Sequence, residues 1–390
     1  MLSSIRNPDG LPVLLTANSS WNLLNFRAPV MRALQDAGYR VLAAVPADEI
    51  ASQISRLGVE THFIPVDARG LSPVRDLRLL LSYGSLLRQL RPAVVLPFTA
   101  KPNIYASFAA AREGIPVINT LTGLGTGFLS GAALQLLLSF LYRRALARSR
   151  RVFFHNEEDR KLFVTQGIVK PTQTEVVPGS GIDLKRFAPT ARHNRNGPPA
   201  FLFIGRLLVD KGINEFLEAA EIVSRTRNAR FRVLGPIDQH PKSISAAALE
   251  RSRANGTVQF LEPVDDVRPF IRDCDCVVLP SYREGLPRVL LEASAMGKPV
   301  IATHVPGCRQ AVDNGFTGLL CKARSVRSLA EALIAMIDLS PLQRAEMGER
   351  GREKATQEFS QQIVIAAYLE AVRNITIEID DRFGSHSPST

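Results

Sequence analysis

The sequence predicts two successive α/β domains, each built on a doubly wound parallel sheet. Short apolar runs recur along the chain, bounded by turn residues and followed by stretches long enough for a helix. Several runs are almost wholly apolar, as strands covered on both faces must be. Strands that alternate with helices are typical of parallel sheets. A polar stretch interrupts the alternation, which then restarts and so indicates a second domain.

The first domain is expected over residues 1–190. Helix-length segments such as Ala28–Ala37 and Ser72–Arg91 separate its apolar runs. The strands predicted for it are Val13–Asn18, Arg40–Pro46, Thr61–Val66, Ala93–Phe98, Pro116–Thr120, Arg151–Asn156 and Thr174–Pro178.

A linker is expected at residues 191–199, where the chain is polar and rich in Pro and Gly. The second domain follows over residues 200–374, and its last helical stretch, about 360–373, is free to pack on either domain. Residues 375–390 are expected to form a flexible tail. The strands predicted for the second domain are Ala200–Gly205, Arg230–Gly235, Val258–Glu262, Cys276–Ser281, Pro299–Thr303 and Thr317–Cys321.

The composition is that of an ordinary globular protein with a basic surplus. Hydrophobic residues make up 45% of the 390 and charged residues 22%. The 48 Lys and Arg exceed the 37 Asp and Glu by 11 charges, which favours anionic partners such as lipid headgroups or phosphorylated substrates. The chain contains no recognisable nucleic-acid motif, so we expect no nucleic-acid partner.

Cysteine usage and hydropathy point to the cytoplasm. The spacing of the four cysteines does not supply two ligand pairs for a metal, so they are expected to be reduced thiols (Cys274, Cys276, Cys308 and Cys321). The first ten residues lack a secretory pattern, and no apolar run approaches the roughly 20 residues that span a bilayer.

Ligands of open parallel sheets bind at the carboxyl ends of the strands. The first strand of the second domain ends at Gly205 and Arg206, and Lys211 follows five residues after Arg206. Gly205 permits a tight turn there. Two cations in this loop have the chemistry to neutralise a diphosphate, although a basic pair in a loop is often merely solvated.

Two glutamates form the stronger signal. Glu284 lies in the loop after the strand Cys276–Ser281, and Glu292 lies in the helix that follows, with seven residues between them. Because Glu292 falls in an apolar stretch, its carboxylate should have a hydroxyl or a cation as partner. The loop continues through Gly285, and the amides that open the helix are suited to phosphate oxygens (Leu286, Arg288 and Val289).

These motifs together resemble the retaining GT-B glycosyltransferases of family 4. The resemblance rests on GRLLVDKG, on the glutamate pair, and on GSGIDLKRF, PVIATHVPG and NGFTGLL, and it covers about residues 11–370. In the first half, KPNIYASFAAAREGIPVINTLTGLGTGF and RVFFHNEEDRKLF are similar to bacterial enzymes that extend undecaprenyl-diphosphate-linked glycans, α-1,3-N-acetylgalactosaminyltransferases among them. The resemblance implies two Rossmann-like domains with a donor cleft between them.

The resemblance also implies roles for single residues. Arg206 and Lys211 would hold the donor diphosphate and stabilise the charge on the departing nucleotide. Glu284 would contact hydroxyls of the donor sugar and Glu292 those of the ribose, while Val264 would border the base. We expect no metal and no cofactor beyond the nucleotide-sugar itself. The Asp273–Cys274–Asp275 stretch spells an acid-x-acid pattern, but it precedes a strand in the wrong architecture for a metal motif.

The acceptor is expected on the first domain, where the chain departs from the family pattern. Many relatives carry a glycine pair after the first strand; here the side-chain amides of Asn18 or Asn22 would replace that contact, and Trp21 is either part of it or simple packing. Where many relatives have a histidine, this chain has Thr122, followed by Gly123 and Gly125. A threonine is no general base, which suits a front-face retaining mechanism, and His155 is interpreted as structural.

Residues Phe128–Tyr142 form a leucine-rich helical stretch that five arginines follow. Its leucines alone would suit a core helix, but the wide apolar face and the arginines favour docking on an anionic membrane surface. Leu137 and Leu138 are taken to carry that contact.

The sequence therefore predicts transfer of a hexose or N-acetylhexosamine from a nucleotide-sugar, UDP-linked, to a lipid-linked glycan, by an enzyme peripheral to the inner face of the cell membrane. The alternatives are a GT-B sugar-nucleotide 2-epimerase and a non-catalytic membrane scaffold. An NAD-dependent dehydrogenase ranks last, because no strand runs into a G-x-G-x-x-G motif with a distant acid.

Overall fold

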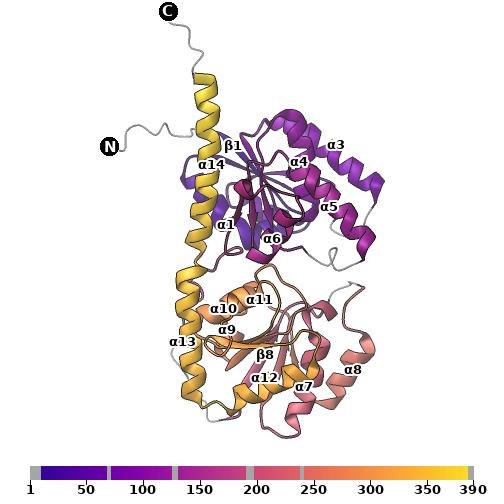
Figure 1. Cartoon of the computed structure of the whole chain (residues 1–390), viewed down its shortest axis with the longest axis vertical. Helices are drawn as coiled ribbons and strands as arrows, with labels where there is room; N and C mark the ends of the chain where they lie inside the picture. The colour runs from indigo at the N-terminus through magenta and orange to yellow at the C-terminus, as the bar shows by residue number, and fades with distance from the viewer. Residues whose placement is uncertain (1–9, 68–71, 125–130, 190–196, 238–240, 385–390) are drawn as a thin grey trace, which may run out of the picture. The chain divides into compact units, whose positions relative to one another are not determined.

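The computed structural model describes residues 10–67, 72–124, 131–189, 197–237 and 241–384 (Figure 1). The chain forms two compact units. The first comprises Met1–Ser180 with Gln362–Thr390, and the second comprises Gly181–Gln361. Each is an α/β unit with parallel strands, as the sequence predicts.

In the first unit the strands run in the order β3-β2-β1-β4, and a second group runs β5-β6-β7. Isolated parallel bridges pair Val95 with Val117 and Phe98 with Thr120, so β5 continues the sheet beside β4. The connection order reverses between β1 and β4. The strands are β1 (Pro12–Thr16), β2 (Arg40–Val45), β3 (Glu60–Phe63), β4 (Val94–Pro97), β5 (Ile118–Leu121), β6 (Arg151–Phe154) and β7 (Thr174–Val176).

Helices cover the sheet of the first unit, and α3, α4 and α5 pack in that order against one another (Figure 1). The helix α1 is longer than predicted because it begins at a cap: the Ser19 hydroxyl accepts a hydrogen bond from the amide of Asn22 at 3.2 Å. The helices are α1 (Ser20–Asp36), α2 (Ala51–Ser55), α3 (Pro73–Leu90), α4 (Ala100–Glu113), α5 (Ala132–Leu146) and α6 (Glu157–Thr165).

The last helix, α14 (Gln361–Gly384), packs into the core of the first unit. Tyr368 is fully buried, and its ring lies 4.9 Å from that of Phe153 and 5.9 Å from that of Phe98. The helix extends through much of the stretch expected as a tail, because Ile375 continues its buried stripe. Of the two packings left open by the sequence, the structure shows this one.

The second unit has one sheet in the order β10-β9-β8-β11-β12-β13, and every pairing is parallel. The strand order reverses between β8 and β11: β9 and β10 lie on one side of β8, and β11, β12 and β13 lie on the other. The strands are β8 (Ala200–Ile204), β9 (Arg230–Leu234), β10 (Val258–Leu261), β11 (Cys276–Leu279), β12 (Val300–Thr303) and β13 (Gly318–Cys321). The unit begins before the expected linker, because Ile182 and Phe187 are buried in its core.

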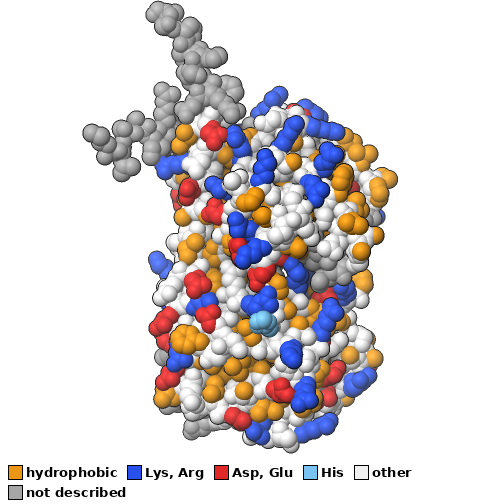
Figure 2. Space-filling model, in the orientation of Figure 1, with side chains coloured by type: hydrophobic (Ala, Val, Ile, Leu, Met, Phe, Trp, Pro, Cys, Tyr) orange, Lys and Arg blue, Asp and Glu red, His pale blue; other side chains and the backbone are white. Residues whose placement is uncertain are grey.

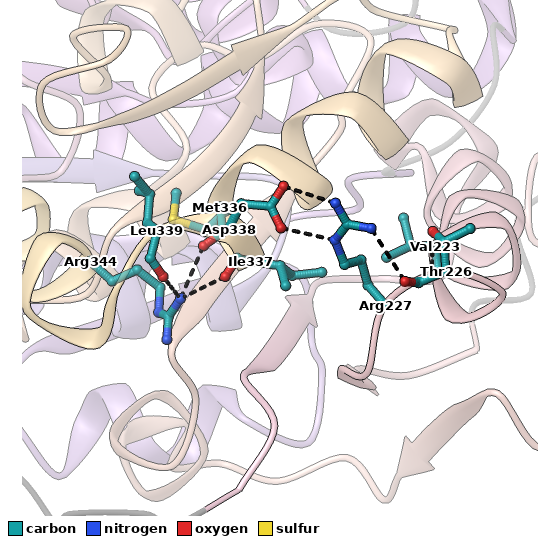
Figure 3. A network of polar contacts seen from close by, with 8 residues as sticks. All are labelled: Val223, Thr226, Arg227, Met336, Ile337, Asp338, Leu339 and Arg344. Carbon is teal, nitrogen blue, oxygen red and sulfur yellow. Dashed lines mark hydrogen bonds and ion pairs between the residues drawn. The ribbon is translucent and has the colours of Figure 1, made fainter.

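The helices of the second unit are α7 (Ile213–Ser224), α8 (Ala246–Asn255), α9 (Arg268–Arg272), α10 (Arg288–Ala295), α11 (Cys308–Ala311), α12 (Val326–Asp338) and α13 (Pro341–Glu358). Figure 3 shows how α12 ends: Arg344 donates to the carbonyls of Met336 and Ile337, both at 3.2 Å, and to that of Leu339. Nearby, Arg227 makes a bidentate ion pair with Asp338, in which Nε donates to Oδ1 at 2.9 Å and Nη2 donates to Oδ2 at 3.1 Å. The Arg227 pair ties the segment after α7 to α12 at the amino edge of the sheet, and the Arg344 contacts tie α13 to the end of α12.

Candidate active site

The candidate donor site lies at the reversal point of the second sheet. The chain leaves β8 toward β9 and leaves β11 toward β12, so the loops after β8 and β11 diverge at the carboxyl edge. Ligands of doubly wound sheets bind in the crevice that this divergence opens. The loop after β8 carries Gly205, whose amide donates to Leu234 at 3.0 Å, and then the exposed Arg206.

A glycine brings Lys211 to the end of β11. Lys211 closes a short 3-10 helix (Val209–Lys211), and Gly212 follows with φ of +74°. A Cβ at Gly212 would lie 2.2 Å from the carbonyl oxygen of Pro280, so only glycine permits this approach. As a result Nζ of Lys211 lies 2.5 Å from Oε1 of Glu284. The structure thus brings together two residues that the sequence singled out separately.

The loop that carries Glu284 is held from the far side by Gly307. A Cβ at Gly307, where φ is +78°, would lie 2.4 Å from the carbonyl oxygen of Gly285. The loop leading into α11 therefore packs directly against the Glu284 backbone. Gly285 and Leu286 are buried by this contact, and the Glu284 carboxylate is directed to Lys211.

Glu292 lies on α10 and has the cation partner expected for it. Nε of Arg288, one turn earlier, lies 3.0 Å from Oε1 of Glu292. Burial raises the pKa of Glu292 above its usual value, and the charge of Arg288 opposes that shift. This helix opens at Arg288 after Pro287, and the N-cap makes no side-chain hydrogen bond to it.

Contacts that the sequence did not reveal support the loop after β11. The hydroxyl of Tyr282 donates to Oε1 of Glu215 at 2.5 Å, and the guanidinium of Arg324 lies 4.7 Å from the Tyr282 ring. The amide of Tyr282 also donates to the carbonyl of Asp210 at 2.9 Å. These contacts fix the loops of Lys211 and Glu284 to one another. The sequence signal for these contacts is Glu215, an acid inside an apolar helical stretch.

Val264, expected to border the base, lies in the loop after β10, and its side chain is exposed. Asp266 follows it and pairs with Arg268 at 2.7 Å. The hydrogen bond from Arg268 lowers the pKa of Asp266. Val264 is therefore at the same edge of the sheet as the glutamates, in a loop that an ion pair holds.

In the first unit the corresponding reversal point lies between β1 and β4. The amide of Asn18 donates to Oγ1 of Thr99 at 3.1 Å and so joins the two loops. Thr99 has φ of 67° and ψ of 163°, a conformation that costs a non-glycine residue about 1–3 kcal/mol and recurs at functional sites. Asn22 lies in the first turn of α1. Thr122 and Gly123 follow β5 and are half-buried, and Gly125 lies outside the described residues.

His155 follows β6 at this edge and is buried. The guanidinium of Arg27, itself 1% exposed, donates to Nε2 of His155 at 3.4 Å and lies 4.4 Å from the ring of Phe98. Burial and the Arg27 charge hold the pKa of His155 well below its usual value, so the imidazole is neutral. The buried arginine was not anticipated from the sequence, where it reads as one more loop cation.

The acid-x-acid stretch has a structural role at the amino end of β11. Oδ2 of Asp275 accepts a hydrogen bond from the amide of Ala200 at 2.8 Å. Cys274 is buried as a free thiol, and burial raises its pKa to about 12. Within the described residues, no group of three or more His, Cys, Asp or Glu is placed to hold a metal ion. In the same part of the chain, no helix combines the length and the apolar character needed to cross a bilayer.

The two units match two family models. Residues 27–179 match the glycosyl transferase 4-like domain, and residues 198–338 match glycosyl transferases group 1. Together the matches cover well over half of the chain, and each falls within one unit.

Curated relatives span most of the chain. A Campylobacter jejuni N,N'-diacetylbacillosaminyl-diphospho-undecaprenol α-1,3-N-acetylgalactosaminyltransferase is 27% identical over 365 residues, covering 90% of this chain and 95% of its own. An Escherichia coli UDP-Gal:α-D-GlcNAc-diphosphoundecaprenol α-1,3-galactosyltransferase is 25% identical and covers 72% of this chain and 75% of its own.

Solved structures share the fold. The crystal structure of Anabaena HepE with UDP and glucose has a TM-score of 0.74 at 16% identity, covering 92% of this chain and 98% of its own. A Rickettsia africae glycosyltransferase has a TM-score of 0.76 at 16% identity, covering 94% and 99%. The expected fold and enzyme class are confirmed: the chain belongs to the GT-B glycosyltransferases of family 4, with a 4-like domain in its first unit and a group 1 domain in its second.

Proposed function

We propose that this glycosyltransferase moves a hexose or N-acetylhexosamine from a UDP-sugar to a glycan carried on undecaprenyl diphosphate, with retention of anomeric configuration. The observation that carries the proposal is the cluster at the reversal point of the second sheet, where Lys211 meets Glu284 at 2.5 Å. The relatives from Campylobacter jejuni and Escherichia coli, whose names specify undecaprenol-linked diphosphates, support the acceptor class.

The donor diphosphate would lie against Arg206, Lys211 and the first turn of α10. The Lys211 ammonium forms an ion pair with the Glu284 carboxylate. A diphosphate would compete for this ammonium and leave the Glu284 carboxylate to accept hydrogen bonds from sugar hydroxyls. As the glycosidic bond breaks, negative charge grows on the leaving phosphate, and fixed cations lower the free energy of that transition state.

Glu292 would bind the ribose hydroxyls, and Val264 would border the base. We propose that no metal is required, because Arg206 and Lys211 supply the positive charge that the departing nucleotide needs. No protein base is invoked either: Thr122 cannot accept a proton near neutral pH, so the leaving diphosphate would take the acceptor proton. This is the front-face retaining mechanism.

We further propose that the first unit docks on an anionic membrane surface at the inner face of the cell membrane. Two exposed apolar stripes support this, Val74, Leu77 and Leu81 on α3, and Leu136, Leu137 and Phe140 on α5. Figure 2 shows exposed hydrophobic side chains along the edge where these helices lie. Arg143 and Arg144 end α5, and the Arg144 guanidinium lies 5.5 Å from the Phe140 ring. Apolar side chains beside arginines suit the headgroup layer of an anionic leaflet.

The experiment that tests the function is a calorimetric titration of the purified protein with UDP and GDP, followed by a transfer assay. We expect saturable binding of UDP, weakened at least about tenfold in Glu292→Ala because the ribose hydroxyls lose their acceptor. Lys211→Ala should bind UDP but lower kcat about 10²–10³-fold, since it removes a charge that acts on the departing phosphate.

Arg227→Ala is the matched control, because it deletes an ion pair at the opposite edge of the same unit. It should bind and turn over like the wild type. Transfer should also persist in EDTA. Wild-type activity in both site variants would refute the site assignment, binding of GDP alone would change the donor, and loss of transfer in EDTA would refute the metal-free mechanism.

A further inference from the structure

Trp21 occupies an unusual position in the first unit. It is the only tryptophan of the chain, and half of its surface is exposed (50%). It lies in the first turn of α1, directly after β1, at the reversal point between β1 and β4. This is the place where a doubly wound sheet binds its ligand. The donor cluster lies in the other unit and makes no use of this side chain.

The indole ring is held in place although it faces solvent. The ring of Phe26 meets it edge to face, with centroids 5.1 Å apart and an interplanar angle of 88°. The side-chain amide of Asn25 donates to the Trp21 carbonyl at 3.0 Å and fixes the backbone of the turn. A ring held this way loses little conformational freedom when a ligand covers it.

The side chains that flank Trp21 in the sequence are polar and uncharged. Asn18 and Ser19 precede it, and Ser20 and Asn22 adjoin it. Oγ of Ser20 and Oδ1 of Asn22 are both buried and have no hydrogen-bond partner among the described residues. Asp48 is already engaged, since its carboxylate accepts from the amides of Ser20 at 2.9 Å and Ile50 at 3.2 Å.

An exposed indole with neighbouring amides and hydroxyls suits both kinds of surface that a pyranose sugar presents, its C–H groups and its hydroxyl groups. The ring presents a face of C–H groups that packs on an aromatic surface, and its hydroxyls need neutral hydrogen-bond partners. A phosphate or an anionic headgroup would instead call for cations, and the one arginine of this part of α1, Arg27, is buried against Phe98.

We propose that Trp21 is the stacking platform for a sugar ring of the acceptor glycan, with Asn22 as a hydrogen-bond partner of its hydroxyls. The inference rests on the proposed function for the identity of the acceptor. It assigns the acceptor sugar to the reversal point of the first unit and gives Trp21 a role in selecting acceptors by their terminal ring rather than by their lipid.

The single tryptophan makes the test direct, because all indole fluorescence comes from Trp21. The probe is N-acetylglucosaminyl diphosphate on a chain of two isoprene units, compared with the same isoprenyl diphosphate without sugar and with phosphatidylglycerol vesicles. We expect a saturable change in emission with the sugar-bearing probe alone. An equal change with the sugar-free lipid or with vesicles, or no change with any of the three, would overturn the proposal.

Kinetics supply the second readout. Trp21→Ala should raise KM for the sugar-bearing probe about tenfold and leave the Kd for UDP within about twofold. Trp21→Phe, which keeps an aromatic face, should recover most of the loss. Phe316→Ala is the matched control, since Phe316 is an aromatic of similar exposure (55%) that precedes β13 at the amino edge of the second sheet.

The outcomes separate this inference from the function on which it rests. A wild type that binds UDP and transfers sugar, with an unchanged KM in Trp21→Ala, would reject the platform and leave the function standing. A wild type that neither binds UDP nor transfers sugar, yet changes its emission with the sugar-bearing probe, would reject the function and leave the platform standing.

Discussion

Glu292 shows how one residue reports on its surroundings. The side chain is mostly buried on α10, and Arg288 lies 3.0 Å away. Burial raises its pKa in spite of that partner, so desolvation outweighs the ion pair. Such a carboxylate is costly to keep in the absence of a ligand. Hydroxyl groups of a bound nucleotide would stabilise its charged form, which gives the cost a functional reason.

Glu292→Gln should therefore change how stability depends on pH. In the wild type the folded protein keeps the Glu292 proton to a higher pH than the unfolded chain does. Between the unfolded pKa, roughly 4.3, and the raised folded value, wild-type stability falls as pH rises. The glutamine variant lacks this loss, so its free energy of unfolding should rise relative to that of the wild type as the pH increases above about 4.3. Denaturant unfolding at several pH values measures it.

Glu60→Gln is the control of opposite sign. A hydrogen bond from Arg40 lowers the pKa of Glu60, so this carboxylate contributes stability that is present above its unfolded pKa and is lost as pH falls. The free energy of unfolding of the wild type should rise relative to that of this variant as pH rises through the acid range. A Glu292→Gln difference that is flat with pH, or that runs in the Glu60 direction, would show that burial does not dominate at Glu292.

Single-residue predictions from the sequence succeeded where the partner is close along the chain. The apolar stretch around Glu292 indicates that its carboxylate needs a partner, and Arg288 lies one helical turn away. The hydrogen bond between Tyr282 and Glu215 joins a loop to a helix 67 residues earlier, and no local pattern encodes it. The contact between Arg27 and His155 also joins residues far apart along the chain, and no local pattern encodes it.

At the scale of elements, strands were easier to predict than helices. Every predicted strand has a counterpart in the structure, because a strand covered on both faces is a short and continuous apolar run. The helix α5 is apolar on too many sides for its orientation to be read from the sequence. The structure divides its apolar side chains: Leu136, Leu137 and Phe140 face outward, while Leu138 and Leu141 pack toward the core. The prediction that Leu138 joins Leu137 in the membrane contact is therefore wrong.

This division sharpens the test of membrane docking. The variant Leu136→Ser with Phe140→Ser removes outward apolar surface and spares Leu138, whose replacement would damage the core. We expect the double variant to lose about tenfold or more in its partitioning onto phosphatidylglycerol vesicles, measured by co-sedimentation, because it loses buried apolar area. Its melting temperature should change little.

Leu342→Ser provides the control for that experiment, because Leu342 is a similarly exposed leucine on α13 of the second unit. It should sediment with vesicles like the wild type. If the α5 variant and the control sedimented equally with vesicles, the contact would lie elsewhere on the molecule, and docking through α5 would be rejected.

At the scale of the whole molecule, the sequence predicts two α/β domains in succession, and the chain does more than that. It builds the first unit, then the second, and returns to the first through α14. The amphipathic pattern of α14 shows that the helix must bury one face, but not against which sheet. Only the packing of Val364, Tyr368 and Val372 among residues of the first unit answers that.

The return of α14 predicts that damage to it should weaken the first unit selectively. Tyr368 is fully buried, and its hydroxyl lies 2.6 Å from that of Thr120. Tyr368→Ala should cost the first unit about 3–5 kcal/mol through the cavity left by the ring, whereas Tyr368→Phe should cost about 1 kcal/mol for the lost hydrogen bond. Hydrogen exchange read by mass spectrometry should show faster opening in peptides from β1, β4 and β6, with β8, β9 and β11 unchanged, and UDP binding should persist. Equal loss of protection in both units would mean that they unfold as one cooperative block, and α14 would then stabilise the whole molecule rather than the unit that it completes.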